Sequence, residues 1–437
     1  MTAPLIPAQH VAAPAAASDS DPHYRRNFTA GLIHGVFFQA AAAFGSIYTV
    51  LPSFVALLTA SPLAVGLMAA IQDGGEIVPQ LFTAYWVEPR PRKKPILVGV
   101  VLIRLISWML LAWLTFQLGA SRPEIVLAVL LTFFSLFSIA GGVGAVVYAD
   151  IFAKAIPAAR RGRFTGWKQL LGYAAAIGAG YVVKLILDDN SGLPFPTNYA
   201  LIFAFSALLF SVALFGVSLI KEPIQPVQRN AASFPDLLRR SLVIVRANAN
   251  FRTLVGVRAL TMAGLALAPF YVVYAQRDLG VDPGMIGIYL SAQMAGAAAS
   301  NLMWGWLGDR YGNKPVVVGT ALAGGLASLL ALLTPTDAPQ LFTLVFVLLG
   351  AAMSGLRLGH PNMLLEMAPA HIRPTCVALQ NTLVAPVVLL PLAVGVAVQF
   401  VSYQVLLTAG VAVMTLAMLL ALRLRDPRRN PDGACFD

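Results

Sequence analysis

Long runs without a charged side chain constrain this chain more than any other feature. The run Ile125 to Ala149 contains no Asp, Glu, Lys or Arg. As an α-helix it would be about 37 Å long, enough to cross the roughly 30 Å hydrocarbon core of a bilayer with tilt. Only 11% of all residues are charged and 58% are hydrophobic, so the exterior requires an apolar solvent. The chain is therefore predicted to be an integral membrane protein.

The same reading gives twelve candidate transmembrane helices, and hence an all-α polytopic membrane protein. A β-barrel would instead show short segments in which polar and apolar residues alternate. The uncharged stretch Pro374 to Leu422 is too long for one crossing, so we divide it at the polar residues near Gln399. The predicted spans are residues 29–58, 62–87, 95–118, 124–152, 166–187, 199–220, 253–276, 283–307, 315–335, 338–367, 375–398 and 402–423.

Basic residues lie mainly on one side of this topology. Of the 30 Lys and Arg residues, 24 lie in the termini and the even-numbered loops, two lie in odd-numbered loops and four lie inside spans. An excess of Lys and Arg marks the cytoplasmic side of a membrane protein. We therefore predict a multi-pass protein of the bacterial inner (plasma) membrane with both termini cytoplasmic. Because topology explains the net charge of +11, no nucleic-acid partner is predicted.

Polar stretches divide the chain into predicted segments. Residues 1–27 lack a basic start and a continuous apolar run, which predicts a disordered cytoplasmic tail and not a secretory signal. Residues 221–252 form a cytoplasmic linker between two six-helix halves, 28–220 and 253–424. Residues 425–437 form a second cytoplasmic tail.

The two halves carry an internal repeat, which parallel six-helix halves would produce. One shift of 220 residues aligns the loops after the second and eighth spans, and another alignment joins the segments after the fourth and tenth spans. The aligned pairs include Trp86 and Trp306, Arg90 and Arg310, Lys94 and Lys314, Pro157 and Pro369, and Arg161 and Arg373.

The segment GWLGDRYGNK, residues 305–314, resembles the loop signature of the Major Facilitator Superfamily, which reads roughly G-x-L-x-D-R-x-G-R-[RK]. Asn313 replaces a basic residue in this copy. The N-terminal copy departs further, with Glu88, Pro89 and Arg92 where glycine, aspartate and glycine would stand. The resemblance implies twelve transmembrane helices in two pseudo-symmetric halves. It also implies a rocker-switch transporter with a central cavity between them.

The charges of the signature are candidates for a conformational latch. Asp309 ends a span where it can accept backbone N–H bonds, and Arg310 can pair with an acid on a neighbouring helix. The resemblance places that acid at the end of the fourth helix of each half. The alternative is that these charges only anchor helix ends at lipid headgroups. The candidate gating residues are Arg90, Lys94, Asp150, Asp309, Arg310, Lys314 and Glu366.

Two acids and an arginine inside the second and third spans are candidates for proton coupling. An ionisable residue inside the bilayer requires a partner or a function. Asp73 and Glu76 share one helix face, and Arg104 lies at a similar depth on the next span. One interpretation is a structural ion pair between Glu76 and Arg104. The other leaves Asp73 as a proton acceptor, because burial and a neighbouring like charge favour its protonated form.

Further polar residues in the spans are candidates for the substrate cavity. Arg357 lies near the midplane and suits an anionic or carbonyl-bearing substrate group, with pairing to Glu366 or to an acid of the N-terminal half as the alternative. His34 has two interpretations, a hydrogen-bonded helix contact and a proton relay. The candidate cavity residues are His34, Gln39, Arg357, Tyr271, Tyr274, Gln293 and Asn381.

Enzyme motifs are absent from the sequence, which has no HExxH, GxxxxGK[ST] or GxSxG pattern. Cys376 and Cys435 have neither disulfide nor metal-ligand spacing. We predict no catalytic residue, metal or cofactor. The predicted function is a monomeric, proton-coupled secondary active transporter, or permease, that moves a small organic solute across the lipid bilayer by alternating access. The alternatives are an uncoupled facilitator and a non-transporting receptor or scaffold on the same fold.

Overall fold

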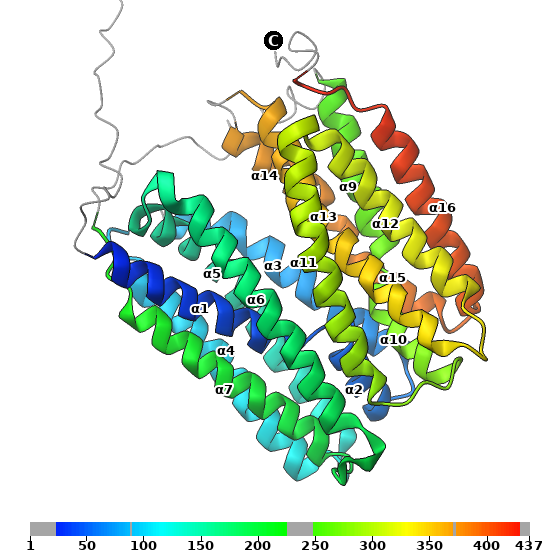
Figure 1. The fold of residues 1–437 in the computed structure, drawn as a ribbon. Helices are drawn as coiled ribbons and strands as arrows, with labels where there is room; N and C mark the ends of the chain where they lie inside the picture. Colours follow the sequence, from blue (N-terminus) through cyan, green and yellow to red (C-terminus); the bar gives the residue numbers. More distant parts are fainter. Residues whose placement is uncertain (1–22, 88–89, 225–247, 370–372, 429–437) are drawn as a thin grey trace, which may run out of the picture.

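The computed structural model describes residues 23–87, 90–224, 248–369 and 373–428. Residues 23–224 form one helical bundle, the N-terminal half, and residues 248–428 form a second bundle beside it, the C-terminal half (Figure 1). The helices of the N-terminal half are α1 (Tyr24–Phe44), α2 (Val50–Leu58), α3 (Pro62–Val87), α4 (Lys94–Leu118), α5 (Pro123–Ala155), α6 (Ala158–Leu187) and α7 (Thr197–Leu219), with a 3-10 turn, η1 (Asp189–Ser191), between α6 and α7.

The C-terminal half follows the same order of elements. Its helices are α9 (Ala249–Leu265), α10 (Ala268–Arg277), α11 (Met285–Tyr311), α12 (Asn313–Leu333), α13 (Thr343–Met367), α14 (Arg373–Val384), α15 (Leu390–Ala397) and α16 (Tyr403–Leu422), with the 3-10 turns η2 (Pro339–Phe342) and η3 (Ala385–Leu389).

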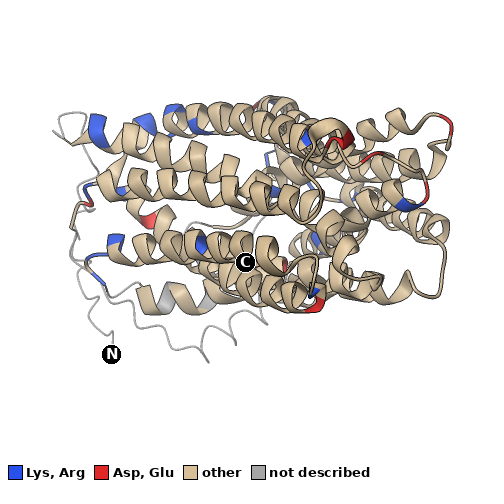
Figure 2. Cartoon of the chain, turned by 90° about the horizontal axis from the view of Figure 1, so that it is seen from below, with Lys and Arg blue, Asp and Glu red and all other residues tan. Residues whose placement is uncertain are grey.

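Helix occupies each of the twelve predicted spans, and the all-α membrane fold is confirmed. Among the described residues, nine helical segments are long and apolar enough to cross a membrane, and twelve crossings stay a prediction. Figure 2 shows few charged residues along the helices, whereas Lys and Arg gather at one end of the molecule. The prediction for the fifth span was wrong by eight residues, since α6 begins at Ala158 and not at residue 166.

Three predicted spans are broken helices. The first is interrupted between α1 and α2 at Gly45, where a Cβ atom would collide with the indole of Trp108 on α4. The seventh is interrupted before Pro269, and the eleventh contains η3 and α15, each of which has a proline in its first turn. Proline has no N–H for the preceding turn, so one hydrogen bond of the regular ladder is missing at each of these prolines.

The predicted tails and linker fall largely outside the described residues. Of the predicted N-terminal tail, residues 1–22 lie outside, and α1 already begins at Tyr24. Residues 225–247 of the predicted linker and residues 429–437 of the predicted C-terminal tail also lie outside. The division into domains stays a prediction.

Matching hydrogen bonds tie down the first and last helix of each half. In the N-terminal half, Asn27 Oδ1 accepts from the Lys221 N–H at 2.8 Å and its Nδ2 donates to the Lys221 carbonyl oxygen at 3.0 Å. In the C-terminal half, Asn250 makes the same two bonds with Arg425, at 2.9 and 3.0 Å. These bonds satisfy backbone groups just beyond a helix end, which the helix itself leaves unpaired.

Two further pairs from the sequence alignment have equivalent bonds. Lys94 Nζ donates to the Ile220 carbonyl oxygen beyond the end of α7, and Lys314 Nζ donates to the Leu422 carbonyl oxygen at the end of α16. Arg161 Nε donates to the carbonyl oxygen five residues before it at 3.1 Å, and Arg373 Nε does so at 3.0 Å. The internal repeat read from the sequence is therefore also a structural repeat.

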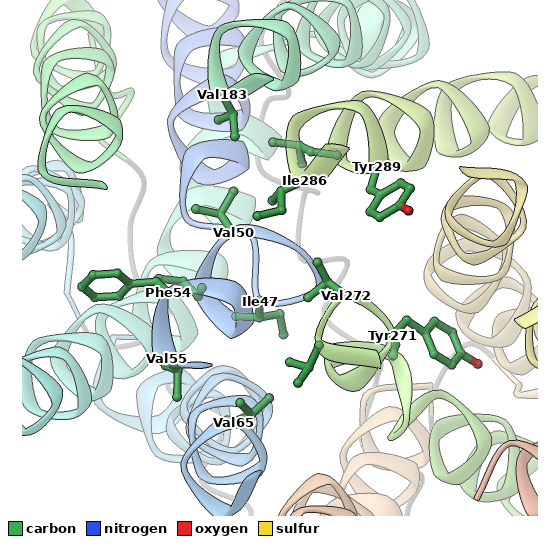
Figure 3. Close-up of a cluster of buried hydrophobic side chains, with 14 of the residues drawn as sticks. Ile47, Val50, Phe54, Val55, Val65, Val183, Tyr271, Val272, Ile286 and Tyr289 are labelled. Carbon is green, nitrogen blue, oxygen red and sulfur yellow. The ribbon is translucent and has the colours of Figure 1, made fainter. Parts of the chain in front are cut away.

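The two halves share one hydrophobic core on only one face of the molecule. We call the face where α1 begins and α16 ends the terminal face, and the other the opposite face. Near the terminal face each half has its own cluster, around Ile151 and Phe164 in the N-terminal half and around Phe251 and Met363 in the C-terminal half. Towards the opposite face a single cluster contains residues of both halves. Figure 3 shows this shared cluster, in which Val50, Val65 and Val183 lie near Val272 and Ile286.

Backbones of the two halves touch directly near the opposite face. Ser291 Oγ on α11 donates to the Ile177 carbonyl oxygen on α6 at 2.9 Å. A Cβ atom at Gly180 would lie 2.7 Å from the Gly287 carbonyl oxygen, so only glycine permits this approach of α6 and α11. In Figure 1 the bundles meet near α2 and α10 and diverge toward the terminal face. The interface between the halves is thus closed on one side of the molecule and splayed on the other.

Candidate functional site

A cavity of about 560 Å³ lies between the two halves. Helices α1, α3, α4, α5 and α6 line it on one side and α11 and α13 on the other. Its volume is in the range of pockets for small organic ligands. The polar and charged lining residues are His34, Gln39, Ser46, Tyr48, Gln72, Asp73, Glu76, Gln80, Arg104, Tyr148, Lys168, Gln169, Tyr173, Gln293, Asn301, Ser354 and Arg357.

Asp73 and Glu76 face this cavity from α3. Their helix packs closely on α5, because a Cβ atom at Gly75 would lie 2.5 Å from Ser138 Cβ. This packing turns the acids away from α5 and towards the cavity. Gln72 Nε2 donates to Glu76 Oε1 at 2.5 Å. The carboxylate of Asp73 forms no hydrogen bond or ion pair with another described side chain. The two acids therefore share the cavity without a common partner in direct contact.

Arg357 reaches the cavity from α13 in the other half. Its charge interacts with those of Glu76 and Asp73, although no ion pair within 4.0 Å joins them among the described residues. The alternative prediction, that Arg357 pairs with Glu366, is wrong, because Glu366 instead pairs with Arg428, whose Nη2 lies 2.5 Å from Glu366 Oε1. Arg357 thus supplies a positive charge opposite the two acids.

Arg104 is buried between aromatic rings on α1 and α5. Its Nε donates to the Phe137 carbonyl oxygen at 3.2 Å, and its guanidinium lies 4.3 Å from the centre of the Phe137 ring and 4.9 Å from that of Phe38. A side chain at Gly141 would collide with the guanidinium. Glu76 and Arg104 do not form the expected ion pair among the described residues, because the guanidinium turns towards α5. Their charges still interact over a longer distance.

His34 joins α1 to α7 and also lines the cavity. Its Nδ1 lies 3.1 Å from the Ala213 carbonyl oxygen, which can only accept, so Nδ1 carries the proton. Its ring lies 5.5 Å from each of the rings of Phe38 and Tyr148. These contacts favour the interpretation of His34 as a hydrogen-bonded helix contact.

Lys168 is a cavity residue that the sequence analysis counted with the basic residues of the loops, although it falls at the start of the predicted span 166–187. Because α6 begins at Ala158, Lys168 lies well inside the helix. Its Nζ donates to Tyr148 Oη at 3.3 Å and lies 5.0 Å from the centre of that ring. Its stem packs on Gly35, where a Cβ atom would lie 2.5 Å from Lys168 Cδ. The missed signal is Pro157, which stands at the N-cap of α6 and is typical of a helix start.

Of the other predicted cavity residues, Gln39 and Gln293 line the cavity and three do not. Tyr271 is buried in the shared cluster and its Oη lies 2.8 Å from Ser328 Oγ. Tyr274 packs against Tyr403, and Asn381 accepts a hydrogen bond from Arg258 Nη1. The prediction was wrong for these three because a polar group in a span can be satisfied between helices of one half. Neutral polar lining residues such as Gln72, Gln80 and Tyr173 carry no comparable sequence signal.

The gating charges of the N-terminal half bond within that half. Asp150 Oδ1 lies 3.0 Å from Lys93 Nζ, and Asp150 Oδ2 lies 2.6 Å from Lys154 Nζ. Asp150 stands where the resemblance places the acidic partner, but neither Arg90 nor Lys94 forms an ion pair with it in this conformation. Arg90 stacks over Trp86, and Lys94 caps α7.

The gating charges of the C-terminal half also stay within their half. Glu366 bonds to Arg428 rather than to Arg310 or Lys314. Arg428 Nη1 in addition donates to the backbone oxygen of Asp309 at 2.9 Å. Arg310 is exposed beside Trp306 and Tyr311, and Lys314 caps α16. In the part of the chain that the structure describes, none of the bonds of these residues joins the two halves at the terminal face, which agrees with the divergence of the bundles there.

Comparison with known proteins agrees with this architecture. Residues 253–434 match the sequence model of the Major Facilitator Superfamily. The C-terminal half is thus similar to this superfamily. The resemblance found in the loop signature is thereby confirmed.

Solved structures of membrane transporters share the fold over nearly the whole chain. The nucleoside transporter NupG is 15% identical, with a TM-score of 0.62 over 92% of this chain and 98% of its own. A bacterial homologue of the lysosomal transporter Spinster, in an inward-facing and unoccupied conformation, is 16% identical, with a TM-score of 0.63 over 93% and 99%. A POT family transporter in complex with 5-aminolevulinic acid is 10% identical, with a TM-score of 0.67 over 93% and 96%.

A curated relative matches a shorter stretch. It is a Na(+), Li(+), K(+)/H(+) antiporter of Planococcus maritimus, 32% identical over 159 residues. The match covers 36% of this chain and 37% of the relative. The chain is thus an integral membrane protein that shares its fold with solved transporters.

Proposed function

We propose that this protein is a secondary active transporter that moves a small organic solute across the membrane by alternating access. One observation carries the proposal: the charged cavity is sealed towards the opposite face by a core shared between the halves, whereas each half has a separate core near the terminal face. A cavity open to one side and closed by a repacking interface is one of the two states that alternating access requires. The volume of about 560 Å³ favours an organic solute over a bare ion.

Coupling to protons is proposed at the acids of α3. Two carboxylates one helical turn apart in a membrane cavity repel each other, so a proton on one of them stabilises the pair. Arg357 faces them from the other half and changes its distance to them when the halves rock. Rocking can therefore change the proton affinity of Asp73, which is the differential interaction that coupling needs.

A second candidate function is exchange of monovalent cations for protons. It is favoured by the antiporter relative and by the two acids, which suit a small cation. An uncoupled facilitator and a receptor on the same fold are the further alternatives, and neither would need an acid pair opposite an arginine.

The proposal is tested with purified protein in two steps. Small organic solutes and Na⁺, Li⁺ and K⁺ are first screened for thermal stabilisation, because a ligand that binds only the folded state raises its apparent stability. The hits are then assayed in proteoliposomes with and without an imposed pH gradient. Accumulation of an organic solute only with the gradient supports the proposal. Equal uptake without the gradient indicates a facilitator, cation-driven proton release indicates cation exchange, and no uptake of any hit overturns transport.

We also propose that both termini are cytoplasmic and that the protein is a monomer in the bacterial inner membrane. The proposal rests on the distribution of Lys and Arg. If both termini are cytoplasmic, the terminal face is the cytoplasmic face, and the observed conformation is open to the cytoplasm. Reporter fusions after Ile220 and after Leu424 should both report cytoplasm, and a periplasmic signal from either would contradict this orientation.

A further inference from the structure

The charges in the cavity do not balance. Three basic side chains line it, Arg104, Lys168 and Arg357, against two acids, Asp73 and Glu76. Glu76 interacts electrostatically with both arginines, and Asp73 interacts with Arg357. With every group ionised the cavity carries one excess positive charge. In a membrane such a charge needs an anion close to it.

Lys168 is the cation that the acids leave uncompensated. Among the described residues no carboxylate lies within 4.0 Å of its Nζ, and the one polar side chain that it contacts is Tyr148, at 3.3 Å from Oη. An ammonium has three hydrogens to donate, so one long bond to a phenol leaves most of its capacity unused. The oxygen of the neighbouring Gln169 amide accepts from Asn301 of the other half.

At the equivalent positions of the C-terminal half, a basic side chain has two strong hydrogen-bond acceptors. The alignment of Arg161 with Arg373 places Gln380 and Asn381 at the positions of Lys168 and Gln169. There the cation comes from α9, since Arg258 Nη1 donates to Gln380 Oε1 at 2.7 Å and to Asn381 Oδ1 at 3.0 Å. That arginine is not among the residues that line the cavity.

We propose that Lys168 binds an anionic group, a carboxylate, of the transported solute. This inference rests on the proposed transport function and names the substrate class of that same cavity. The ammonium forms a charge-assisted hydrogen bond with the carboxylate, and Tyr148 Oη donates a second one from beside it. The apolar residues that line the cavity contact the carbon skeleton. The solute is therefore an organic acid or a zwitterion with a free carboxylate.

Matched probes test the charge preference on the unmodified protein. Purified full-length protein in detergent is heated with 3-phenylpropionate, 3-phenylpropionamide or 3-phenylpropylamine, and with hexanoate, hexanamide or hexylamine. Each set keeps the skeleton and changes only the charge. The carboxylates should raise the melting temperature more than the amides, and the amines should not raise it. Equal shifts for acid and amide, larger shifts for the amines, or no shift with any carboxylate would overturn the proposal.

Variants then locate the site. Lys168→Gln introduces the residue that stands at the equivalent position 380, so the helix packing should tolerate it. Carboxylate binding should weaken by about tenfold to hundredfold, as expected for loss of a charge-assisted hydrogen bond. Lys168→Arg should keep most of the binding. Lys221→Gln is the control, because it removes the same charge from an exposed side chain outside the cavity.

The outcomes separate this proposal from the transport proposal. If proteoliposomes accumulate a solute and Lys168→Gln leaves its binding unchanged, the carboxylate site is wrong and transport stands. If carboxylates bind through Lys168 and no solute is moved, the site stands and transport is wrong. If Lys168→Gln does not fold, the acid-to-amide preference of the unmodified protein and the binding retained by Lys168→Arg still decide the question.

Discussion

The N-terminal and C-terminal halves agree at the terminal face and differ in the cavity. At the terminal face Asn27 and Asn250 make the same pair of backbone hydrogen bonds. In the cavity the shift of 220 residues that aligns the signature loops places Gln293 at the position of Asp73, and both side chains line the cavity. An acid that can carry a proton in one half is thus an amide that cannot titrate in the other.

A second pair of positions shows the same contrast. Tyr148 lines the cavity beside Lys168, whereas His360, at the equivalent position, is fully buried and its two ring nitrogens have no hydrogen-bond partner among the described residues. The N-terminal half turns its polar groups to the cavity, and the C-terminal half bonds Arg258 to its own helices. The repeat accounts for the fold, and the departures from the repeat account for the chemistry of the site.

The largest expected effect comes from removing the acid that the repeat lacks. Asp73→Asn should abolish solute accumulation driven by a pH gradient while leaving exchange of solute across the membrane, because the amide cannot bind the coupling proton. Both activities are measured in proteoliposomes with the solute found by the stability screen. Gln293→Asn is the matched control and should keep at least half of the accumulation. Concentration of solute by Asp73→Asn at the parent level would show that Asp73 is not the coupling site.

The two cations should differ in their effect on stability. Arg258→Leu leaves the carbonyl oxygens of Gln380 and Asn381 without a donor, so we expect a loss of about 2 kcal/mol in the free energy of unfolding. Lys168→Gln removes a charge with one weak partner and should change it by less than about 1 kcal/mol. Unfolding in detergent by increasing mole fractions of SDS measures both. Equal losses would mean that Lys168 is a structural cation like Arg258.

The loop signature should matter for one conformation only. In the observed state Asp309 is exposed, and Arg428 bonds to its backbone oxygen and not to its carboxylate. If its carboxylate bonds only when the terminal face closes, Asp309→Asn destabilises the closed state by about 1 kcal/mol and raises the ratio of open to closed molecules by about fivefold. Labelling of Ala145→Cys, a position that lines the cavity, should become faster.

Asp282→Asn is the control for this measurement, since Asp282 is exposed in the loop before α11, away from the terminal face. An unchanged labelling rate together with normal turnover in Asp309→Asn would exclude the latch.

Most of the fold could be predicted because bilayer thickness sets the length of an uncharged run. The predicted span 62–87 matches α3 residue for residue. The breaks within spans could not be predicted in the same way. The interruption after α1 depends on the contact of Gly45 with Trp108 from another helix, which no local pattern reveals.

Charged residues inside spans predicted much of the cavity, although Lys168 was missed and Arg258, another charge inside a span, bonds within its own half. Asp73, Glu76, Arg104 and Arg357 stand inside spans, and all four line the cavity. The sequence could not predict whether the side chain of Tyr271 points to the cavity or to a neighbouring helix. Polar side chains of membrane helices do both, and Tyr271 bonds to Ser328. Assigning each neutral polar residue to the cavity or to a helix contact requires the packing itself.

The smallest expected effect tests the part of the comparison in which the halves agree. Asn27→Ala and Asn250→Ala each remove two hydrogen bonds to backbone groups next to a helix end, and each should lower the free energy of unfolding by about 1 kcal/mol. Because the bonds have the same donors, acceptors and lengths to within 0.1 Å, the two losses should agree within about 0.5 kcal/mol, close to the scatter expected for equivalent sites. SDS unfolding of both variants and of the double variant measures this. If only one variant lowers the free energy of unfolding, only that half depends on its terminal-face bonds. The two halves would then share a structure at this face but not its contribution to stability.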